Sequence, residues 1–280
     1  MTAVSLPHTQ PFLKWAGGKQ RLLAQYEPFF PPRQTIGRYF EPFIGSAAVF
    51  FHLQPKQAIL SDRNEKLIDL YQTIRDDVDG VIAALQPHCN ESDYFYAVRA
   101  QKPETLTAVQ RAARLIYLNK TCYNGLYREN SKGEFNVPFG RYKNPTICDE
   151  ERLRAASLAL QNVQLVAADF EMVVETAVPS DFIYFDPPYA PLNATSSFTS
   201  YNKHGFTAND QKRLAAVVAA LTQRGCRVML SNSNAPLIHN LYAGKGYCLT
   251  PIQARRNINS KAHQRGPIKE LLITNYKIPT

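Results

Sequence analysis

The chain has 280 residues, with 32 Lys and Arg against 23 Asp and Glu, and a formal net charge of +9. Hydrophobic residues make up 45% of it, which supports a packed core and excludes a disordered chain. No stretch reaches the apolar length of a membrane span, the first residues lack a secretory signal pattern, and the five cysteines form no CxxC pair. We therefore expect a cytoplasmic protein without membrane contact, and no disulfide scaffold.

Taken in chain order, short apolar runs bounded by turn residues predict strands over residues 38–40, 58–61, 163–167, 182–185, 226–231 and 268–276. Apolar residues at helical spacing predict helices over residues 64–77, 107–120, 150–160 and 209–224. Thr207 and Asp210 stand near capping-box spacing before the last helix, and Gly225 suits its end. Strands alternating with helices predict a mostly parallel sheet with helices on both faces. The alternation stops between about 65 and 152, which we interpret as an insertion.

The positive charge is concentrated in two segments. Residues 111–143 carry seven basic against two acidic side chains, and residues 255–269 carry five basic and no acidic ones. Basic segments on an otherwise neutral chain are typical of a polyanion-binding surface, although two solvated faces would give the same pattern.

The sequence Asp186-Pro187-Pro188-Tyr189 directly follows the predicted strand over residues 182–185. Ligands of open α/β sheets bind outside the carboxyl ends of the strands. An acid, a stiff turn with carbonyl acceptors and an aromatic ring suit the exocyclic amine of a flat base, on which the ring can stack. The alternative is a plain turn with a helix-capping Asp, which we consider the weaker interpretation.

Other polar groups also follow predicted strands. Gly45 comes shortly after Glu41, where small residues let a ligand approach a helix start, although a tight turn would look the same. Asp62 stands where nucleotide-binding folds hold a ribose, but it could instead cap the next helix, a role that Asn64 could also fill. Asp169 is an open candidate for contact with the adenine of a cofactor.

The segment from Lys14 to Lys19 carries Trp15 and two glycines but not the P-loop spacing, so it suits a loop touching a nucleotide-like ligand or DNA better than an NTPase site. Residues 123–128 and 135–142 interleave aromatic rings, amides and arginines, the mixture that reads nucleic acid. A β-hairpin with surface aromatics is the alternative, and Asn124-Gly125 is a strong turn signal. The six histidines are scattered without a metal-binding or hydrolase motif, so no metal is expected.

These motifs, in this order, resemble the Dam-type N6-adenine DNA methyltransferases, the D12 class that includes GATC-specific enzymes. The resemblance covers about residues 11–276 and is carried by FLKWAGGK, EPFIGS, LSDRN, NGLYR, GEFNVPFGRY, YFDPPYAPL and LSNSN. It implies an α/β fold, a Rossmann-like S-adenosylmethionine-dependent methyltransferase sheet with an inserted, mainly helical target-recognition domain. The catalytic domain would comprise residues 1–64 and 153–280, and the target-recognition, DNA-binding domain residues 65–152.

The resemblance implies S-adenosyl-L-methionine as methyl donor, S-adenosyl-L-homocysteine as product, and a flipped-out adenine in double-stranded DNA, within GATC, as target. Motifs and resemblance together give as catalytic candidates Asp186, Pro187, Pro188 and Tyr189. The cofactor-binding candidates are Trp15, Lys19, Glu41, Gly45, Asp62, Asp169 and Asp186. The DNA-binding candidates are Lys14, Tyr123, Asn124, Leu126, Arg128, Asn136, Pro138, Arg141 and Tyr142.

Some alternatives remain at this point. The family's cofactor turn has two glycines two residues apart, whereas here Gly45 is followed by Ser46 and Ala47, which puts cofactor affinity in question. The same chemistry would serve cytosine N4 or adenine in RNA, and a DNA-binding protein without catalysis would keep the basic segments. We expect a monomer or weak dimer in a prokaryotic cytoplasm, associated with DNA and with a cognate restriction endonuclease as a potential partner.

Overall fold

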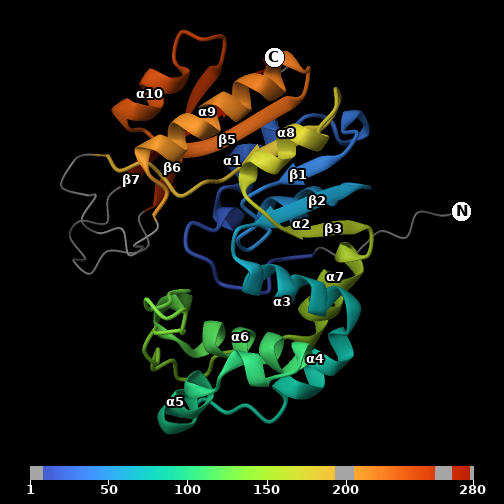
Figure 1. Cartoon of the computed structure of the whole chain (residues 1–280), viewed down its shortest axis with the longest axis vertical. Coiled ribbons are helices and arrows are strands. Elements are labelled where there is room, and N and C mark those ends of the chain that lie inside the picture. The colour runs from blue at the N-terminus through green and yellow to red at the C-terminus, as the bar shows by residue number, and fades with distance from the viewer. Residues whose placement is uncertain (1–8, 193–204, 256–266, 278–280) are drawn as a thin grey trace, which may run out of the picture. The chain divides into compact units, whose positions relative to one another are not determined.

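The computed structural model describes residues 9–192, 205–255 and 267–277 (Figure 1). The strands in these residues are β1 (Tyr39–Glu41), β2 (Ala58–Asp62), β3 (Val163–Ala167), β4 (Phe182–Phe185), β5 (Arg227–Ser233), β6 (Cys248–Arg255) and β7 (Pro267–Thr274). They form a sheet in the order β3-β2-β1-β4-β5-β7-β6. β1 pairs in parallel with β2 and β4, and β4 with β5, whereas β7 runs antiparallel between β5 and β6. The predicted α/β fold with a mostly parallel sheet is confirmed.

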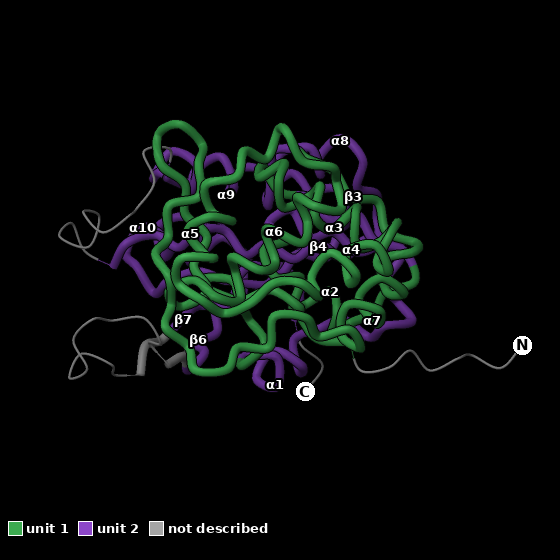
Figure 2. Tube along the Cα trace, turned by 90° about the horizontal axis from the view of Figure 1, so that it is seen from below, with its two compact units in different colours: residues 1–21, 44–56, 62–167 green, residues 22–43, 57–61, 168–280 purple. Residues whose placement is uncertain are grey.

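The chain divides into two compact units, which Figure 2 distinguishes by colour. Unit 1 comprises residues 1–21, 44–56 and 62–167, and unit 2 comprises residues 22–43, 57–61 and 168–280. The segment 65–152, which we predicted as a target-recognition domain, lies within unit 1. Its limits as a separate domain stay a prediction.

Helices dominate unit 1 in the described residues: α2 (Ala48–Leu53), α3 (Glu65–Asp76), α4 (Val78–Leu85), α5 (Ser92–Ala100), α6 (Ala108–Thr121) and α7 (Glu150–Leu160). α6 packs against α3, α4 and α5. Leu67, Leu70 and Ile74 line the buried face of α3, as their spacing predicts. Asn64 caps α3 and a capping box at Thr107 begins α6. The predicted helices are confirmed, whereas α4 and α5 were not predicted.

Unit 2 contains α1 (Leu23–Tyr26), α8 (Val173–Thr176), α9 (Ala208–Gln223) and α10 (Pro236–Tyr242). Helix α9 packs against β5 through a face that includes Leu214 and Leu221, both fully buried. Thr207 and Asp210 form the predicted capping box, and Gly225 follows the helix with a φ of +84°. Local signals therefore fix both ends of α9, which accounts for the accuracy of the prediction there.

Strand β6 was not predicted, because Pro251 lies in its middle and proline is rare inside sheets. It pairs with β7 and is the last strand in the sheet order. Two residues after Pro251, the backbone of Gln253 faces away from β7. Its carbonyl accepts from the Gln25 side chain at 3.0 Å, and its N–H donates to the Gln25 side chain at 3.3 Å. Residues two apart in a strand present their backbone to the same side, so the missing N–H of Pro251 faces away from β7 and costs no ladder bond.

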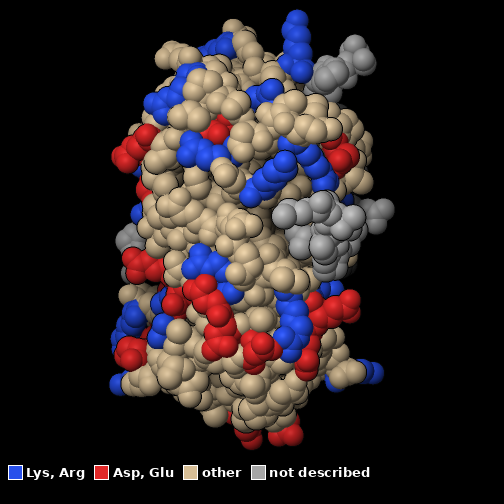
Figure 3. All heavy atoms as spheres, turned by 90° about the vertical axis from the view of Figure 1, so that its right-hand side faces the viewer, with Lys and Arg blue, Asp and Glu red and all other residues tan. Residues whose placement is uncertain are grey.

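The first basic segment, residues 111–143, lies in unit 1. The side chains of the second one, residues 255–269, lie outside the described residues. Figure 3 shows one face on which Lys and Arg side chains are interspersed with Asp and Glu. Several cations of the chain are paired with acids, for example Arg111 with Asp69 and Lys66 with Glu129.

Asp181, just before β4, stabilises unit 2 through several hydrogen bonds to its buried carboxylate. Its carboxylate is 1% exposed and accepts from the backbone N–H groups of Arg38 and Val178 and from the Arg38 guanidinium at 2.7 Å. We expect Asp181→Ala to lower the free energy of unfolding by about 3 kcal/mol, because several buried donors lose their acceptor. Asp79→Ala, which removes a 75% exposed partner of Arg154, should cost less than about 1 kcal/mol. Urea denaturation measures both, and equal losses would contradict the assigned role of Asp181.

Candidate functional site

Parallel strands place the candidate catalytic turn of unit 2. The carboxyl ends of β1, β4 and β5 lie at the same edge of the sheet. β1 ends at the buried Glu41, whose carboxylate accepts from the Tyr39 hydroxyl at 2.8 Å. Asp186 follows the last residue of β4. Ligands of open α/β sheets bind at this edge, so the turn from Asp186 to Tyr189 lies where the sequence predicts it.

The Asp186 carboxylate is held from the neighbouring strand. Phe185 pairs with Leu230 in the β4–β5 register, so Asp186 comes beside Ser231. The Ser231 hydroxyl donates to Asp186 Oδ1 at 2.7 Å, and the Tyr184 hydroxyl lies 3.0 Å from Ser231 Oγ. Because Ser231 has one hydrogen to give, it accepts from Tyr184 while it donates to Asp186. This chain fixes the orientation of the carboxylate.

The backbone of the same turn is held by β5 and α9. The Gln211 side chain donates to the Pro188 carbonyl at 3.0 Å, and Ala190 N–H donates to Asn232 Oδ1 at 3.0 Å. Gln211 and Asn232 also bond to each other at 3.0 Å and are both buried. The Pro187 carbonyl, by contrast, receives no hydrogen bond from the described residues. The turn therefore presents one available carbonyl next to an oriented carboxylate.

The Tyr189 ring is half-buried, and its hydroxyl donates to Glu270 Oε2 in β7 at 2.7 Å. Burial, followed by the negative charge of Asp186, raises the pKa of Tyr189 well above its usual value. Burial and the charge of Asp186 also raise the pKa of the Tyr184 hydroxyl. Both hydroxyls therefore keep their protons at neutral pH and act as hydrogen-bond donors.

In unit 1 the structure brings together three cofactor candidates, Trp15, Gly45 and Asp62. Gly45 has a φ of +45°, and a Cβ added there would lie 2.9 Å from the Trp15 ring. Only glycine lets the turn approach the indole this closely. Backbone N–H groups of Asn64, Gly45 and Arg63 lower the pKa of Asp62, but burial raises it more. The turn and the carboxylate thus form one cluster.

Asp62, the last residue of β2, does not cap α3. Its Oδ1 accepts from Asn64 N–H at 3.0 Å, while the Asn64 side chain accepts from Leu67 N–H and caps the helix. The capping alternative is therefore filled by Asn64. A partly buried carboxylate at a strand end, beside a glycine turn, fits the ribose hydroxyls of a nucleoside cofactor.

The departure from the family turn is visible in the backbone. Ala47, the residue before α2, lies in the left-handed region, with φ 55° and ψ 31°. For a residue with a side chain this conformation costs about 1–2 kcal/mol, so the backbone of this turn is strained at Ala47.

The remaining cofactor candidates are engaged locally. Lys19 is buried and its ammonium donates to the Gly17 carbonyl at 2.6 Å. Asp169, in unit 2, accepts from Glu171 N–H at 3.1 Å and forms an ion pair with Arg213 at 3.1 Å. Their contact with a cofactor stays a prediction.

The DNA-binding candidates all lie in unit 1, and Lys14 brings several of them together. Its backbone N–H and carbonyl both bond to the Asn119 side chain, at 2.9 and 2.7 Å. Its ammonium lies 4.2 Å from the centre of the Tyr142 ring. Its side chain crosses Gly125, where a Cβ would lie 2.5 Å away. Asn124 and Gly125 both have positive φ, which confirms the predicted turn.

Arg128 and Asn136 face each other across the same loop. Arg128 Nε donates to Asn136 Oδ1 at 2.7 Å and its Nη2 to the Asn136 carbonyl at 3.2 Å. Isolated antiparallel bridges, Cys122 with Phe139 and Glu129 with Phe135, replace the strands of a regular hairpin. The exposed members of the candidate set are Lys14, Tyr123, Asn124, Pro138 and Arg141.

Tyr127 was not singled out from the sequence. Its ring stacks on Trp15, with 5.4 Å between ring centres, and its hydroxyl bonds to Glu129. Ser231 and Glu270 were also missed as partners of the candidate catalytic turn. Ser231 belongs to the motif LSNSN, but its partner depends on strand register, and no local signal marks Glu270.

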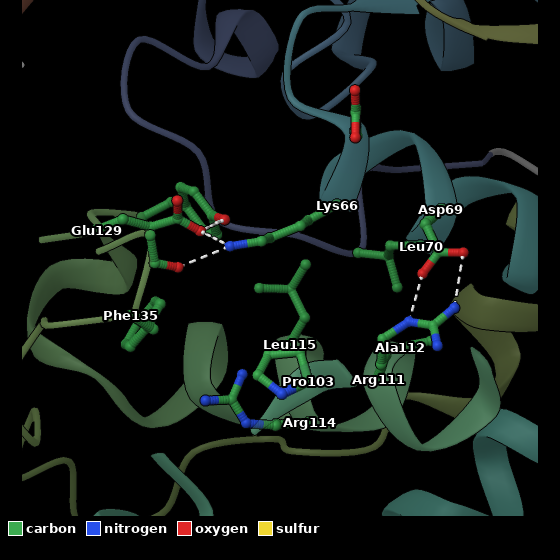
Figure 4. A pocket seen from close by; sticks show the side chains of 13 residues that line it. Lys66, Asp69, Leu70, Pro103, Arg111, Ala112, Arg114, Leu115, Glu129 and Phe135 are labelled. Carbon is green, nitrogen blue, oxygen red and sulfur yellow. Dashed lines mark hydrogen bonds and ion pairs between the residues drawn. The ribbon is translucent and has the colours of Figure 1, made fainter. Parts of the chain in front are cut away.

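A cavity of about 330 Å³ lies in unit 1 beneath the loop that contains Glu129 and Phe135 (Figure 4). Lys66 points toward Glu129 and also donates to the Gly133 carbonyl, and Arg111 points toward Asp69. None of the candidate site residues lines it. The pair of Lys66 with Glu129 holds the loop to α3, and the pair of Arg111 with Asp69 holds α6 to α3.

The residues that the structure describes contain no cluster of three or more potential metal ligands and no helix long and apolar enough to span a membrane.

The sequence of this chain is similar to those of known proteins. Residues 15–258 match the family described as D12 class N6 adenine-specific DNA methyltransferase. The chain is 46% identical to the Type II methyltransferase M.MjaIII of Methanocaldococcus jannaschii, over 95% of this chain and 99% of that protein. It is 42% identical to the Type II methyltransferase M1.LlaDCHI of Lactococcus lactis subsp. cremoris, over 95% of both chains. It is 36% identical to the DNA adenine methylase of Escherichia coli K12, over 93% of both chains.

Lys120 in α6 makes the stability of unit 1 depend on pH. Burial, with repulsion from Arg152 and Lys14, lowers its pKa from 10.5 to about 8. Between pH 8 and 10.5 the unfolded chain therefore binds more protons, and stability rises with pH. We expect Lys120→Met to stabilise the protein at pH 7, by up to about 3 kcal/mol, with the gain shrinking above pH 8. Urea denaturation at pH 7 and 9.5 measures it. The exposed Lys143→Met is the matched control, and a gain independent of pH would contradict the cause.

Proposed function

This chain belongs to the D12 class of N6 adenine-specific DNA methyltransferases, and we propose that it methylates adenine within GATC sites of duplex DNA after the base has left the helix. Transfer to the N6 amine of adenine in DNA is the activity of the family. The site sequence, base flipping and the residue roles below are the proposal. The observation that carries them is the turn from Asp186 to Tyr189, with its oriented carboxylate and available Pro187 carbonyl.

The amine of adenine is a poor nucleophile, because its lone pair is delocalised into the ring. In the proposed mechanism Asp186 and the Pro187 carbonyl each accept one N–H of N6. A more tetrahedral nitrogen then directs its lone pair at the methyl carbon, where the N6–C bond forms as the bond to sulfur breaks and its electron pair stays on sulfur. Asp186 would take the proton that N6 loses. Preorganised acceptors of this kind lower the barrier without reorganisation.

Family membership implies S-adenosylmethionine, which supplies a methyl group activated by a sulfonium. We propose that Asp62 accepts from its ribose hydroxyls and that Trp15 and Gly45 form the wall of its site. The position of Asp62 supports this, because its partly buried carboxylate ends β2 beside the Gly45 turn. Lys19, Glu41 and Asp169 complete the proposed set.

The proposed target must leave the duplex, because N6 inside the stack is out of reach of a turn at a sheet edge. Tyr189 would stack on the extrahelical base, since its ring is half-buried and its hydroxyl is held. For sequence reading we propose Lys14, Leu126, Arg128 and Pro138, with Tyr123 and Asn124 entering the duplex. Tyr123 is 51% exposed at the start of the turn that follows α6, which supports this role. We also propose that a restriction endonuclease acts on the same site, since relatives are named Type II methyltransferases.

The direct test uses labelled S-adenosylmethionine with two duplexes, one containing GATC and one scrambled. We expect N6-methyladenine in the GATC duplex alone, and a loss of turnover of at least about 100-fold in Asp186→Ala with DNA binding retained, because a transition-state interaction is removed. Methylation of both duplexes would discard the proposed site. Normal turnover in Asp186→Ala would discard the assigned mechanism.

Arg128→Ala should relax sequence choice rather than abolish binding. If Arg128 reads guanine, its loss costs about 1–3 kcal/mol of discrimination at one position. Methylation rates on GATC and on singly substituted sites measure this. Lys132→Ala, an exposed change in the same loop, is the control. A loss equal on all duplexes would make Arg128 a phosphate contact instead.

A further inference from the structure

A carboxylate from the far end of the chain reaches the catalytic turn. Glu270 lies in β7, where it pairs with Ser233 of β5. Its Oε2 accepts from the Tyr189 hydroxyl at 2.7 Å, across 81 residues of sequence. Because β7 runs antiparallel to β5, the beginning of β7 lies beside the carboxyl end of β5. The arrangement therefore brings a further acid, from an antiparallel strand, to the edge that carries Asp186.

This hydrogen bond is of the strong kind. The Tyr189 hydroxyl stays protonated at neutral pH, so it donates to a carboxylate, and charge-assisted bonds are about twice as strong as neutral ones. The hydroxyl oxygen of a tyrosine lies on the axis of rotation about the Cβ–Cγ bond, so a hydrogen bond to it restricts rotation about the Cα–Cβ bond and fixes where the ring lies. Backbone contacts to Pro188 and Ala190 hold the start of the side chain, while Glu270 holds its far end.

We propose that Glu270 is a positioning residue for the methyl transfer: it fixes the location of the Tyr189 ring so that the target base stacks with its amine at Asp186. The inference rests on the proposed function, in which Tyr189 stacks on the base. Glu270 takes no part in the bond changes. Glu270 orders the ring before the base binds, so less conformational entropy is lost on binding. This is the effect of preorganisation.

The test compares Glu270→Ala, Glu270→Gln, Tyr189→Phe and the double variant Glu270→Ala/Tyr189→Phe. Single-turnover methyl transfer is measured at saturating DNA and S-adenosylmethionine. We expect Glu270→Ala and Tyr189→Phe each to slow transfer about 10-fold, with the KM for S-adenosylmethionine unchanged. The double variant should be no slower than either single one, because both remove the same bond. Glu270→Gln should recover most of the rate, since an amide oxygen still accepts from the hydroxyl.

Controls separate positioning from folding. Glu175→Ala changes an exposed glutamate of α8 and should leave the rate unchanged. The melting temperature of each variant reports on stability, and Tyr189→Phe removes the hydrogen bond without altering β7, which keeps the test valid if Glu270→Ala folds poorly. With 2-aminopurine as target base, a change of fluorescence in both single variants, relative to the parent complex, would report altered stacking.

Three results would overturn the inference: a normal transfer rate in Glu270→Ala, a Glu270→Gln variant as slow as Glu270→Ala, or additive losses in the double variant. Failure of the proposed function looks different. Asp186→Ala and Tyr189→Ala would then keep normal turnover, whatever Glu270 does. If those two variants are inactive while Glu270→Ala is normal, the proposed function stands and the positioning role alone fails.

Discussion

The parallel pairing of β1, β4 and β5 is the constraint on which the candidate catalytic turn depends. The carboxyl ends of parallel strands lie at the same edge of a sheet. The residue after β4 therefore contacts side chains of β5 directly, and no loop has to fold over the sheet to bring them together. The β4–β5 register then decides which side chain it meets, and a shift of one residue would replace Ser231 with a neighbour on the opposite face. Antiparallel β7 supplies Glu270 to the same edge from the other chain direction. Strand direction and register together determine the position of the site.

Burial gives this edge its electrostatic character. The Tyr184 and Tyr189 hydroxyls lie close to the charge of Asp186, and both that charge and desolvation hold them in the protonated state. A hydroxyl that cannot ionise is a dependable donor, and donors oriented toward carboxylates are worth more in a low dielectric than in water. The Ser231 hydroxyl donates to Asp186 and the Tyr189 hydroxyl donates to Glu270, while the Pro187 carbonyl adds a neutral acceptor.

Local signals made much of the fold predictable. The strands over residues 163–167 and 182–185 were predicted with their exact limits, because each is an apolar run between turn residues. The cap at Thr207 depends on neighbours three residues apart. Contacts between distant residues were not predictable: Asp186 with Ser231 and Tyr189 with Glu270 depend on strand order and register. Helices α4 and α5 and strand β6 also escaped prediction, the last because Pro251 argues against a strand unless that strand is at an edge.

The placement of Pro251 and Gln25 has a consequence for association. An edge strand normally offers a row of free N–H and C=O groups onto which a strand of another molecule can add. On β6 the outward position at residue 251 has no N–H, and both backbone groups of Gln253 are already bonded to the Gln25 side chain. A strand that approached β6 there would find no N–H donor at residue 251. At residue 253 it would find an N–H and a carbonyl that are both already bonded. The middle of this edge therefore resists the strand addition by which β proteins aggregate.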